Sequence, residues 1–163
     1  MKLGGAGNMP AGENNTMEKM TEELAGKMLD EQGYHCSQVV ISHASEQLGL
    51  EKEEAMKLAS GLGGGCFAGE TCGAVSGAII LLGLKYGFSA PNSKEQDQIL
   101  KNKIHEFEKK FVDRCGSLTC RGLLDGLSNA DPEQSKLIEE RGLYSRCKTY
   151  CAASCEILDE MLK

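Results

Sequence analysis

Eight cysteines are the residues of this 163-residue chain with the widest range of possible chemistry. A thiolate can attack a disulfide, take part in electron transfer or ligate a metal. The stretch MKLGGAGNMPAGENNT at the start has one lysine and no apolar run of the kind found in signal peptides, so we expect a cytoplasmic protein. In a reducing compartment, grouped cysteines bind metals or carry out redox chemistry more often than they form structural bridges. The cysteines are Cys36, Cys66, Cys72, Cys115, Cys120, Cys147, Cys151 and Cys155.

Four of these cysteines share one placement, because each is predicted to lie in the first turn of a helix. The unpaired N–H groups and partial positive charge of a helix N-terminus lower the pKa of a thiol and so raise its thiolate fraction. If the four helix starts lie on one side of the molecule, their thiolates converge into one site. The alternative for each is that it is a small buried packing residue. The four are Cys36, Cys72, Cys120 and Cys147.

The remaining cysteines call for other interpretations. Cys151 and Cys155 follow at helical spacing in the last predicted helix and are typical of a core stripe, and Cys115 extends the apolar face of a long helix. These three are therefore predicted to be packing residues. Cys66 lies in a loop where packing does not explain it, and it is a candidate additional ligand or resolving thiol.

A glycine-rich segment, GGGCFAGETCGAVSGA at residues 63–78, surrounds two of the cysteines. Glycine lets the backbone approach a bound atom closely, and a glycine loop that leads into a helix start can form a nest for an anion such as a thiolate or a cluster. Gly64, Gly65 and Gly73 are accordingly predicted to bind a cofactor. The alternative is that these glycines allow only a sharp turn and tight helix packing. No strand precedes the segment and no Gly-Lys-Ser/Thr follows it, which excludes a dinucleotide fingerprint and a P-loop.

Helices must position these residues, because apolar side chains recur at helical spacing and no segment alternates as a strand does. The pattern predicts a disordered segment over residues 1–15. Residues 16–163 are predicted to form a single all-α, cysteine-rich domain, a bundle of about six or seven helices. The helix from Cys72 is apolar nearly all round, so we expect it to be buried at the centre. Helices are predicted from about Thr16, over Cys36–Leu48, Lys52–Leu62, Cys72–Tyr86, Lys94–Arg114 and Cys120–Leu124, from Pro132, and from Ser145 to about Leu162.

Charge and composition narrow the class of partner. The net charge of −6 argues against a nucleic acid or an anionic membrane surface, and the apolar stretch Ala74–Leu84 is too short to span a bilayer. We expect no nucleic-acid and no membrane partner. A redox partner protein or a small-molecule electron donor or acceptor is expected instead, and a homodimer is left open.

The sequence CGAVSG at residues 72–77 matches the CGAxxG signature of the C_GCAxxG_C_C family of redox-active proteins. The chain resembles this family from about residue 30 to residue 160, through YHCSQVV, GETCGAVSGAIILLGLKYG, CRGLL and RCKTY. The resemblance places the four cysteines of the family at Cys36, Cys72, Cys120 and Cys147, the same four that the helix starts select. It implies redox activity without naming a reaction.

Several chemistries fit this set. Four thiolates can hold a [2Fe–2S] or [4Fe–4S] cluster, and an iron–sulfur electron-transfer protein is the leading expectation. Zinc in the same four thiolates would have a structural role. Metal-free thiol–disulfide exchange would use Cys36 and Cys72 as attacking and resolving thiols. A helical interaction domain with incidental cysteines is a further alternative, and whether the protein is an enzyme stays open.

Overall fold

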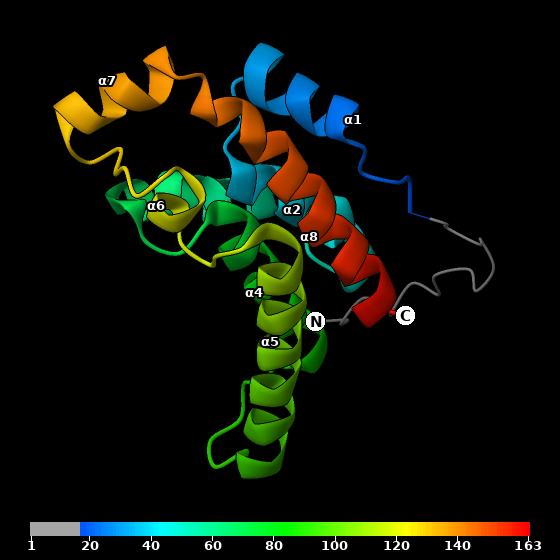
Figure 1. The fold of residues 1–163 in the computed structure, drawn as a ribbon. Coiled ribbons are helices and arrows are strands. Elements are labelled where there is room, and N and C mark those ends of the chain that lie inside the picture. The colour runs from blue at the N-terminus through cyan, green and yellow to red at the C-terminus, as the bar shows by residue number, and fades with distance from the viewer. Residues whose placement is uncertain (1–16) are drawn as a thin grey trace, which may run out of the picture.

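Figure 1 shows the computed structural model of the protein, which describes residues 17–163. These residues form eight α-helices and no β-strand, which confirms the all-α prediction. The prediction for residues 1–15 falls outside the described residues. Two of the helices, α1 and α6, have only five and four residues, and they take the number above the predicted six or seven. The helices are α1 (Glu22–Gly26), α2 (Cys36–Ala44), α3 (Lys52–Ala59), α4 (Gly73–Tyr86), α5 (Lys94–Cys115), α6 (Cys120–Leu123), α7 (Pro132–Glu140) and α8 (Cys147–Met161).

The first and last helices begin at other residues than predicted, because other residues cap their N-termini. The first helix does not begin near Thr16 but at Glu22, because the Thr21 hydroxyl accepts a hydrogen bond of 3.1 Å from the Leu24 N–H. A π-helical turn, η1 (Lys27–Glu31), continues it. The last helix begins at Cys147 rather than at Ser145, whose hydroxyl donates to the Gly142 carbonyl within a preceding 3₁₀ turn.

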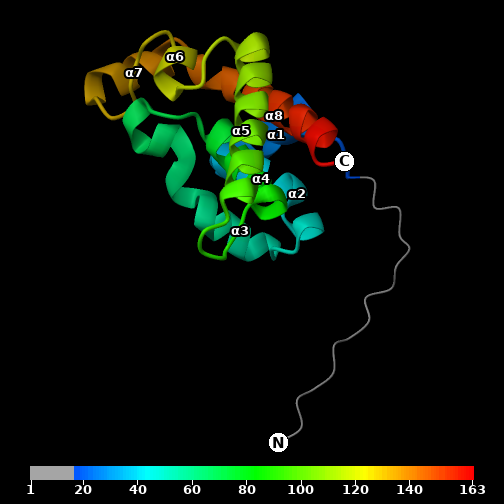
Figure 2. The same cartoon turned by 90° about the horizontal axis from the view of Figure 1, so that it is seen from below.

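Helix α4 lies at the centre of the bundle, as its apolar composition predicts. It packs against α2, α5 and α8, and Ala74, Val75, Ala78, Leu81 and Leu82 are almost completely buried (Figures 1 and 2). A hydroxyl from α8 supplements the apolar contacts, since Ser154 Oγ donates to the Ala74 carbonyl at 2.7 Å.

The close approach of α2 to α4 depends on glycine, and this gives a first prediction. A Cβ at Gly77 would lie 2.8 Å from the Ser37 carbonyl oxygen, whereas a Cβ at Gly83, six residues along the same helix, would meet nothing within 4 Å. Gly77→Ala is expected to destabilise the protein by about 1–2 kcal/mol through overpacking. Gly83→Ala is expected to stabilise it by about 0.5–1 kcal/mol, because alanine is the better helix former. Urea unfolding of both variants followed by circular dichroism measures the two effects, and equal shifts would contradict the proposed α2–α4 contact.

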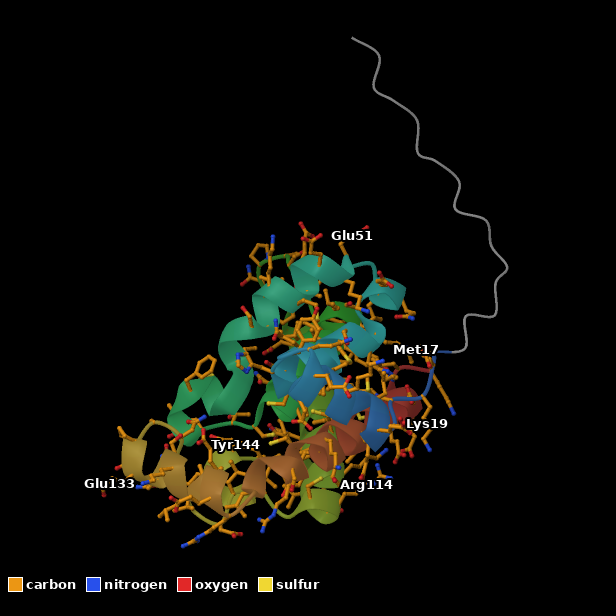
Figure 3. All side chains as sticks on the ribbon, turned by 90° about the horizontal axis from the view of Figure 1, so that it is seen from above. Met17, Lys19, Glu51, Arg114, Glu133 and Tyr144 are labelled. Atoms are coloured by element: carbon orange, nitrogen blue, oxygen red, sulfur yellow. The ribbon has the colours of Figure 1, made fainter. Side chains whose placement is uncertain are left out.

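Helix α8 closes the bundle and carries two of the cysteines into the core. Cys151 and Cys155 are 0% and 1% exposed, as expected for packing residues, and Cys115 packs against the same core. On the outer side of α8, Glu156 accepts from Arg114 of α5 at 2.9 Å and lies 3.4 Å from the Lys19 ammonium. Figure 3 labels Lys19 and Arg114, which lie on the same side of the molecule. Within residues 17–163, no helix has the length and apolar character needed to cross a bilayer.

Candidate functional site

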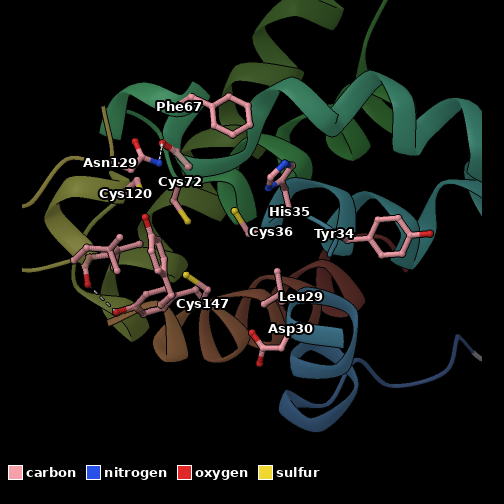
Figure 4. A pocket seen from close by; sticks show the side chains of 15 residues that line it. Leu29, Asp30, Tyr34, His35, Cys36, Phe67, Cys72, Cys120, Asn129 and Cys147 are labelled. Carbon is pink, nitrogen blue, oxygen red and sulfur yellow. Dashed lines mark hydrogen bonds between the residues drawn. The ribbon is translucent and has the colours of Figure 1, made fainter. Parts of the chain in front are cut away.

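A cavity of about 510 Å³ brings together the four cysteines that the helix starts select. Cys36, Cys120 and Cys147 are the first residues of α2, α6 and α8, and Cys72 immediately precedes α4 as its N-cap. Figure 4 shows the sulfur atoms of Cys36, Cys72 and Cys147 directed into this space. Four segments that are distant in the sequence therefore contribute thiols to one surface.

Backbone and side-chain hydrogen bonds hold these segments together. Two segments cross in a short antiparallel bridge, in which the Cys72 N–H donates to the Leu118 carbonyl at 2.8 Å and the Cys120 N–H donates to the Glu70 carbonyl at 2.6 Å. The Tyr150 hydroxyl of α8 donates to the Leu123 carbonyl at the end of α6 at 3.2 Å. This hydrogen bond joins the start of α8 to α6, and it holds Cys147, the first residue of α8, close to the other three cysteines.

Cys36 and Cys72 form a pair with opposite preferences for the proton. The Cys72 thiol donates to the Cys36 sulfur, and the backbone N–H groups of Gly64, Ser37 and Gly73 donate to the same atom. These donors outweigh the effect of burial and lower the pKa of Cys36 from 9.0 to about 6. The pKa of Cys72 is raised well above its ordinary value, first because its proton is held by Cys36, and then by burial and by the negative charge of Cys36. At neutral pH the pair is a thiolate and a thiol.

Cys120 and Cys147 behave differently from what their helix starts predict. Burial raises the pKa of Cys120 to about 11 and that of Cys147 to about 12, and in both cases the negative charge of Cys36 contributes further. The expectation of four thiolates is therefore wrong for the two thiols, which stay protonated at neutral pH. Burial outweighs the helix N-terminus at both, and α6, with four residues, has little dipole to offer.

A zinc ion and an iron–sulfur cluster place different demands on the positions of the four thiols. Across the described part of the chain, no three His, Cys, Asp or Glu side chains converge closely enough to hold one metal ion. A single zinc ion would need its sulfur ligands about 2.3 Å away. An iron–sulfur cluster would bind its thiolates through different irons.

The glycine loop supplies both a hydrogen-bonding wall and close contacts. Gly64 lines the cavity, and its N–H, like that of Gly73, donates to the Cys36 sulfur. A Cβ at Gly73 would overlap Cys36 Sγ, and a Cβ at Gly65 would lie 2.9 Å from the Cys120 Cβ. Two of its N–H groups face the Cys36 sulfur, and its glycines let the chain pack directly against the cysteines. The binding of a cofactor by Gly64, Gly65 and Gly73 stays a prediction.

Four consecutive residues of this loop adopt left-handed backbone angles, with φ of 59° at Gly64, 64° at Gly65, 57° at Cys66 and 54° at Phe67. The last two are not glycine, and each costs roughly 1–2 kcal/mol in this conformation. The turn places the Phe67 ring at the cavity mouth, 51% exposed and edge-on to the His35 ring at a centroid distance of 5.2 Å. Cys66 is exposed and does not line the cavity, so the structure offers no support for a role as an additional ligand there.

Some residues of the site were not predicted from the sequence. Cys151, fully buried beneath the pair, donates from its sulfur to the Cys36 carbonyl at 3.8 Å. Asn129 lines the cavity, and its side-chain amide donates to the Gly64 carbonyl at 3.1 Å. Tyr34 and Tyr150 also line it; both lie within three residues of a predicted cysteine, which was a usable signal. Nothing in the sequence marks Asn129.

Comparison with known proteins gives one match. The family model described as "Putative redox-active protein (C_GCAxxG_C_C)" matches residues 34–161, a range that contains all eight cysteines. No curated protein and no solved structure matches the chain.

Proposed function

Because the chain belongs to the C_GCAxxG_C_C family of redox-active proteins, we propose that the cavity is a thiol–disulfide redox site in which Cys36 attacks and Cys72 resolves. The observation that carries this proposal is the convergence of the Cys36 and Cys72 sulfur atoms in one cavity (Figure 4), where the Cys72 thiol lowers the pKa of Cys36 to about 6. It keeps Cys36 as the nucleophilic thiolate and places a second sulfur next to it. An attacking thiol is most effective when its pKa is near or below the ambient pH, as that of Cys36 is.

The reaction proceeds in two exchanges. The Cys36 thiolate attacks one sulfur of a substrate disulfide, which forms a mixed disulfide and releases the other substrate sulfur as a thiolate. Cys72 then gives its proton to that thiolate and attacks Cys36 Sγ. The products are a Cys36–Cys72 disulfide, one substrate thiol and one substrate thiolate, which takes its proton from solvent, so that two electrons pass from the protein to the substrate.

The structure suggests how Cys72 becomes reactive at the right moment. Its high pKa has two causes that depend on Cys36 being a thiolate, the shared hydrogen bond and the negative charge. Both disappear once Cys36 is bonded to the substrate sulfur. Cys72 can then lose its proton more easily, and resolution follows attack in the correct order.

The pH dependence of alkylation tests the proposal. In a Cys66→Ser variant, which removes the exposed thiol, the rate of Cys36 alkylation by iodoacetamide is expected to be half-maximal near pH 6, since the thiolate is the reacting form and Cys36 is protonated below this pH. Peptide mapping after mild oxidation should locate a Cys36–Cys72 disulfide. A half-maximal rate near pH 9, or a disulfide that omits one of the two, would reject the site.

An iron–sulfur cluster is the second candidate, favoured by the placement of four cysteines around one cavity. Cys36, Cys72, Cys120 and Cys147 would hold it, and it would supply one-electron transfer. Iron, zinc and sulfide are to be quantified in protein prepared without oxygen. Stoichiometric iron and sulfide that are lost in Cys120→Ser or Cys147→Ser would favour the cluster; zinc alone would indicate a structural site. These two variants separate the candidates, because thiol–disulfide exchange by Cys36 and Cys72 does not require them.

A further inference from the structure

The wall of the cysteine cavity is mainly apolar and aromatic. Tyr34, Phe67, Tyr144 and Tyr150 are among its lining residues, which is half of the four phenylalanines and four tyrosines in the chain, although the Tyr34 ring is directed away from the cysteines (Figure 4). Phe67 and Tyr144 are partly exposed, at 51% and 38%. Leu29, Leu123 and Leu124 complete the apolar surface. Such a wall binds a small molecule through its apolar and aromatic area.

The charge of the wall has one sign. Asp30 of the η1 turn contributes a carboxylate, and among residues 17–163 no lysine or arginine lines the cavity. Arg146 is paired with Asp125 at 2.9 Å, and Arg121 lies 3.7 Å from Glu70. The Lys148 side chain passes beside Asp30, since both lie within 4.0 Å of the point that a Cβ at Gly26 would occupy, but Lys148 does not line the cavity. An anionic substrate that enters the cavity would therefore approach the Cys36 thiolate past the Asp30 carboxylate.

From this wall we infer the substrate class: a small, uncharged disulfide with aromatic or apolar substituents, with Asp30 as the residue that disfavours anionic disulfides. The inference rests on the proposed thiol–disulfide function. The exchange is the one already described, with the aromatic substituent against the wall of rings and the disulfide at Cys36. Anionic disulfides, which carry carboxylates near the sulfur atoms, are poor substrates for the same site.

Two chromogenic aromatic disulfides make a matched pair of probes. 2,2′-Dithiodipyridine is uncharged at neutral pH, and 5,5′-dithiobis(2-nitrobenzoate) carries one carboxylate on each ring. Their rate constants with the Cys66→Ser protein are measured by stopped flow, and the ratio of the two is divided by the same ratio for 2-mercaptoethanol. We expect the normalised ratio to favour the uncharged reagent by about three- to fivefold, the size of effect expected when one carboxylate meets another at a solvent-exposed site.

Variants of Asp30 and of its neighbour Glu31 test whether Asp30 causes the preference for the uncharged reagent. Asp30→Asn is expected to reduce the normalised preference by at least about threefold. Glu31→Gln removes the same charge from the next residue, which is exposed as Asp30 is but does not line the cavity, and it should leave the preference unchanged. A normalised ratio near one, or equal effects of the two variants, would overturn the inference while leaving a reactive Cys36. If neither reagent reacts faster than with an ordinary thiol, the proposed function itself fails.

Discussion

Replacing Cys72 by alanine is expected to slow the alkylation of Cys36 at pH 7 by about ten- to hundredfold. With a pKa of about 6, Cys36 is mostly thiolate at pH 7, whereas a thiol at the ordinary value of 9.0 is only about one-hundredth ionised. The thiol of Cys72 is the largest cause of this shift, and its loss leaves burial opposed only by the N–H groups of Gly64, Ser37 and Gly73. Iodoacetamide kinetics against pH in a Cys66→Ser background measure the change.

Cys72→Ser is the matched control, because its hydroxyl can still donate to the Cys36 sulfur. It should retain most of the alkylation rate at pH 7 but should stop at the mixed disulfide, since serine cannot resolve it. Mass spectrometry after addition of a substrate disulfide distinguishes the two states. Should Cys72→Ala react as fast as the unaltered protein, the backbone N–H groups alone would account for the thiolate.

Replacing Gly65 by alanine is expected to lower the free energy of unfolding by about 3 kcal/mol or more. A Cβ there would overlap the Glu70 N–H and lie 2.6 Å from the Glu70 carbonyl oxygen, and backbone atoms cannot move aside as a side chain does. Glu70 also accepts the hydrogen bond from the Cys120 N–H, so the clash reaches the bridge between the two cysteine segments. Denaturant unfolding measures the loss of stability, and the alkylation rate reports the effect on Cys36.

Gly142→Ala separates this clash from backbone strain. Gly142 has φ of 65°, close to the 64° of Gly65, but a Cβ there would meet nothing within 4 Å. Its alanine variant should lose only about 1 kcal/mol, the cost of a left-handed alanine. Comparable losses in the two variants would mean that the Gly65 contact with Glu70 is not tight.

The helices and the four cysteines of the site could be predicted from the sequence, because they depend on patterns between residues close together in the chain. Helical periodicity and a turn before each helix fix where a helix starts, and Cys36, Cys72, Cys120 and Cys147 were selected at such starts. The structure then brings all four to one cavity. The core positions of Cys151 and Cys155 followed from the same periodicity.

The ionisation of the site could not be obtained in this way. Which thiol loses its proton depends first on the Cys72 thiol and then on N–H groups that reach Cys36 from Gly64 and Gly73, all of which follow α3 in the chain. The left-handed angles of Cys66 and Phe67 are equally hidden, because such residues normally avoid them and only the surrounding contacts impose them. The contact between Asn129 and Gly64 likewise arises only when the chain is folded.

If Cys36 and Cys72 form a disulfide as proposed, their oxidation would also change the conformational entropy of the unfolded chain. A disulfide between these residues would enclose α2 and α3 in a covalent ring and restrict the denatured ensemble, whereas the dithiol form would leave that ensemble unconstrained. By the loop-closure relation, a ring of this size is worth about 3–4 kcal/mol. The oxidised protein would then resist unfolding more than the reduced one, and its survival in the cell would follow its redox history.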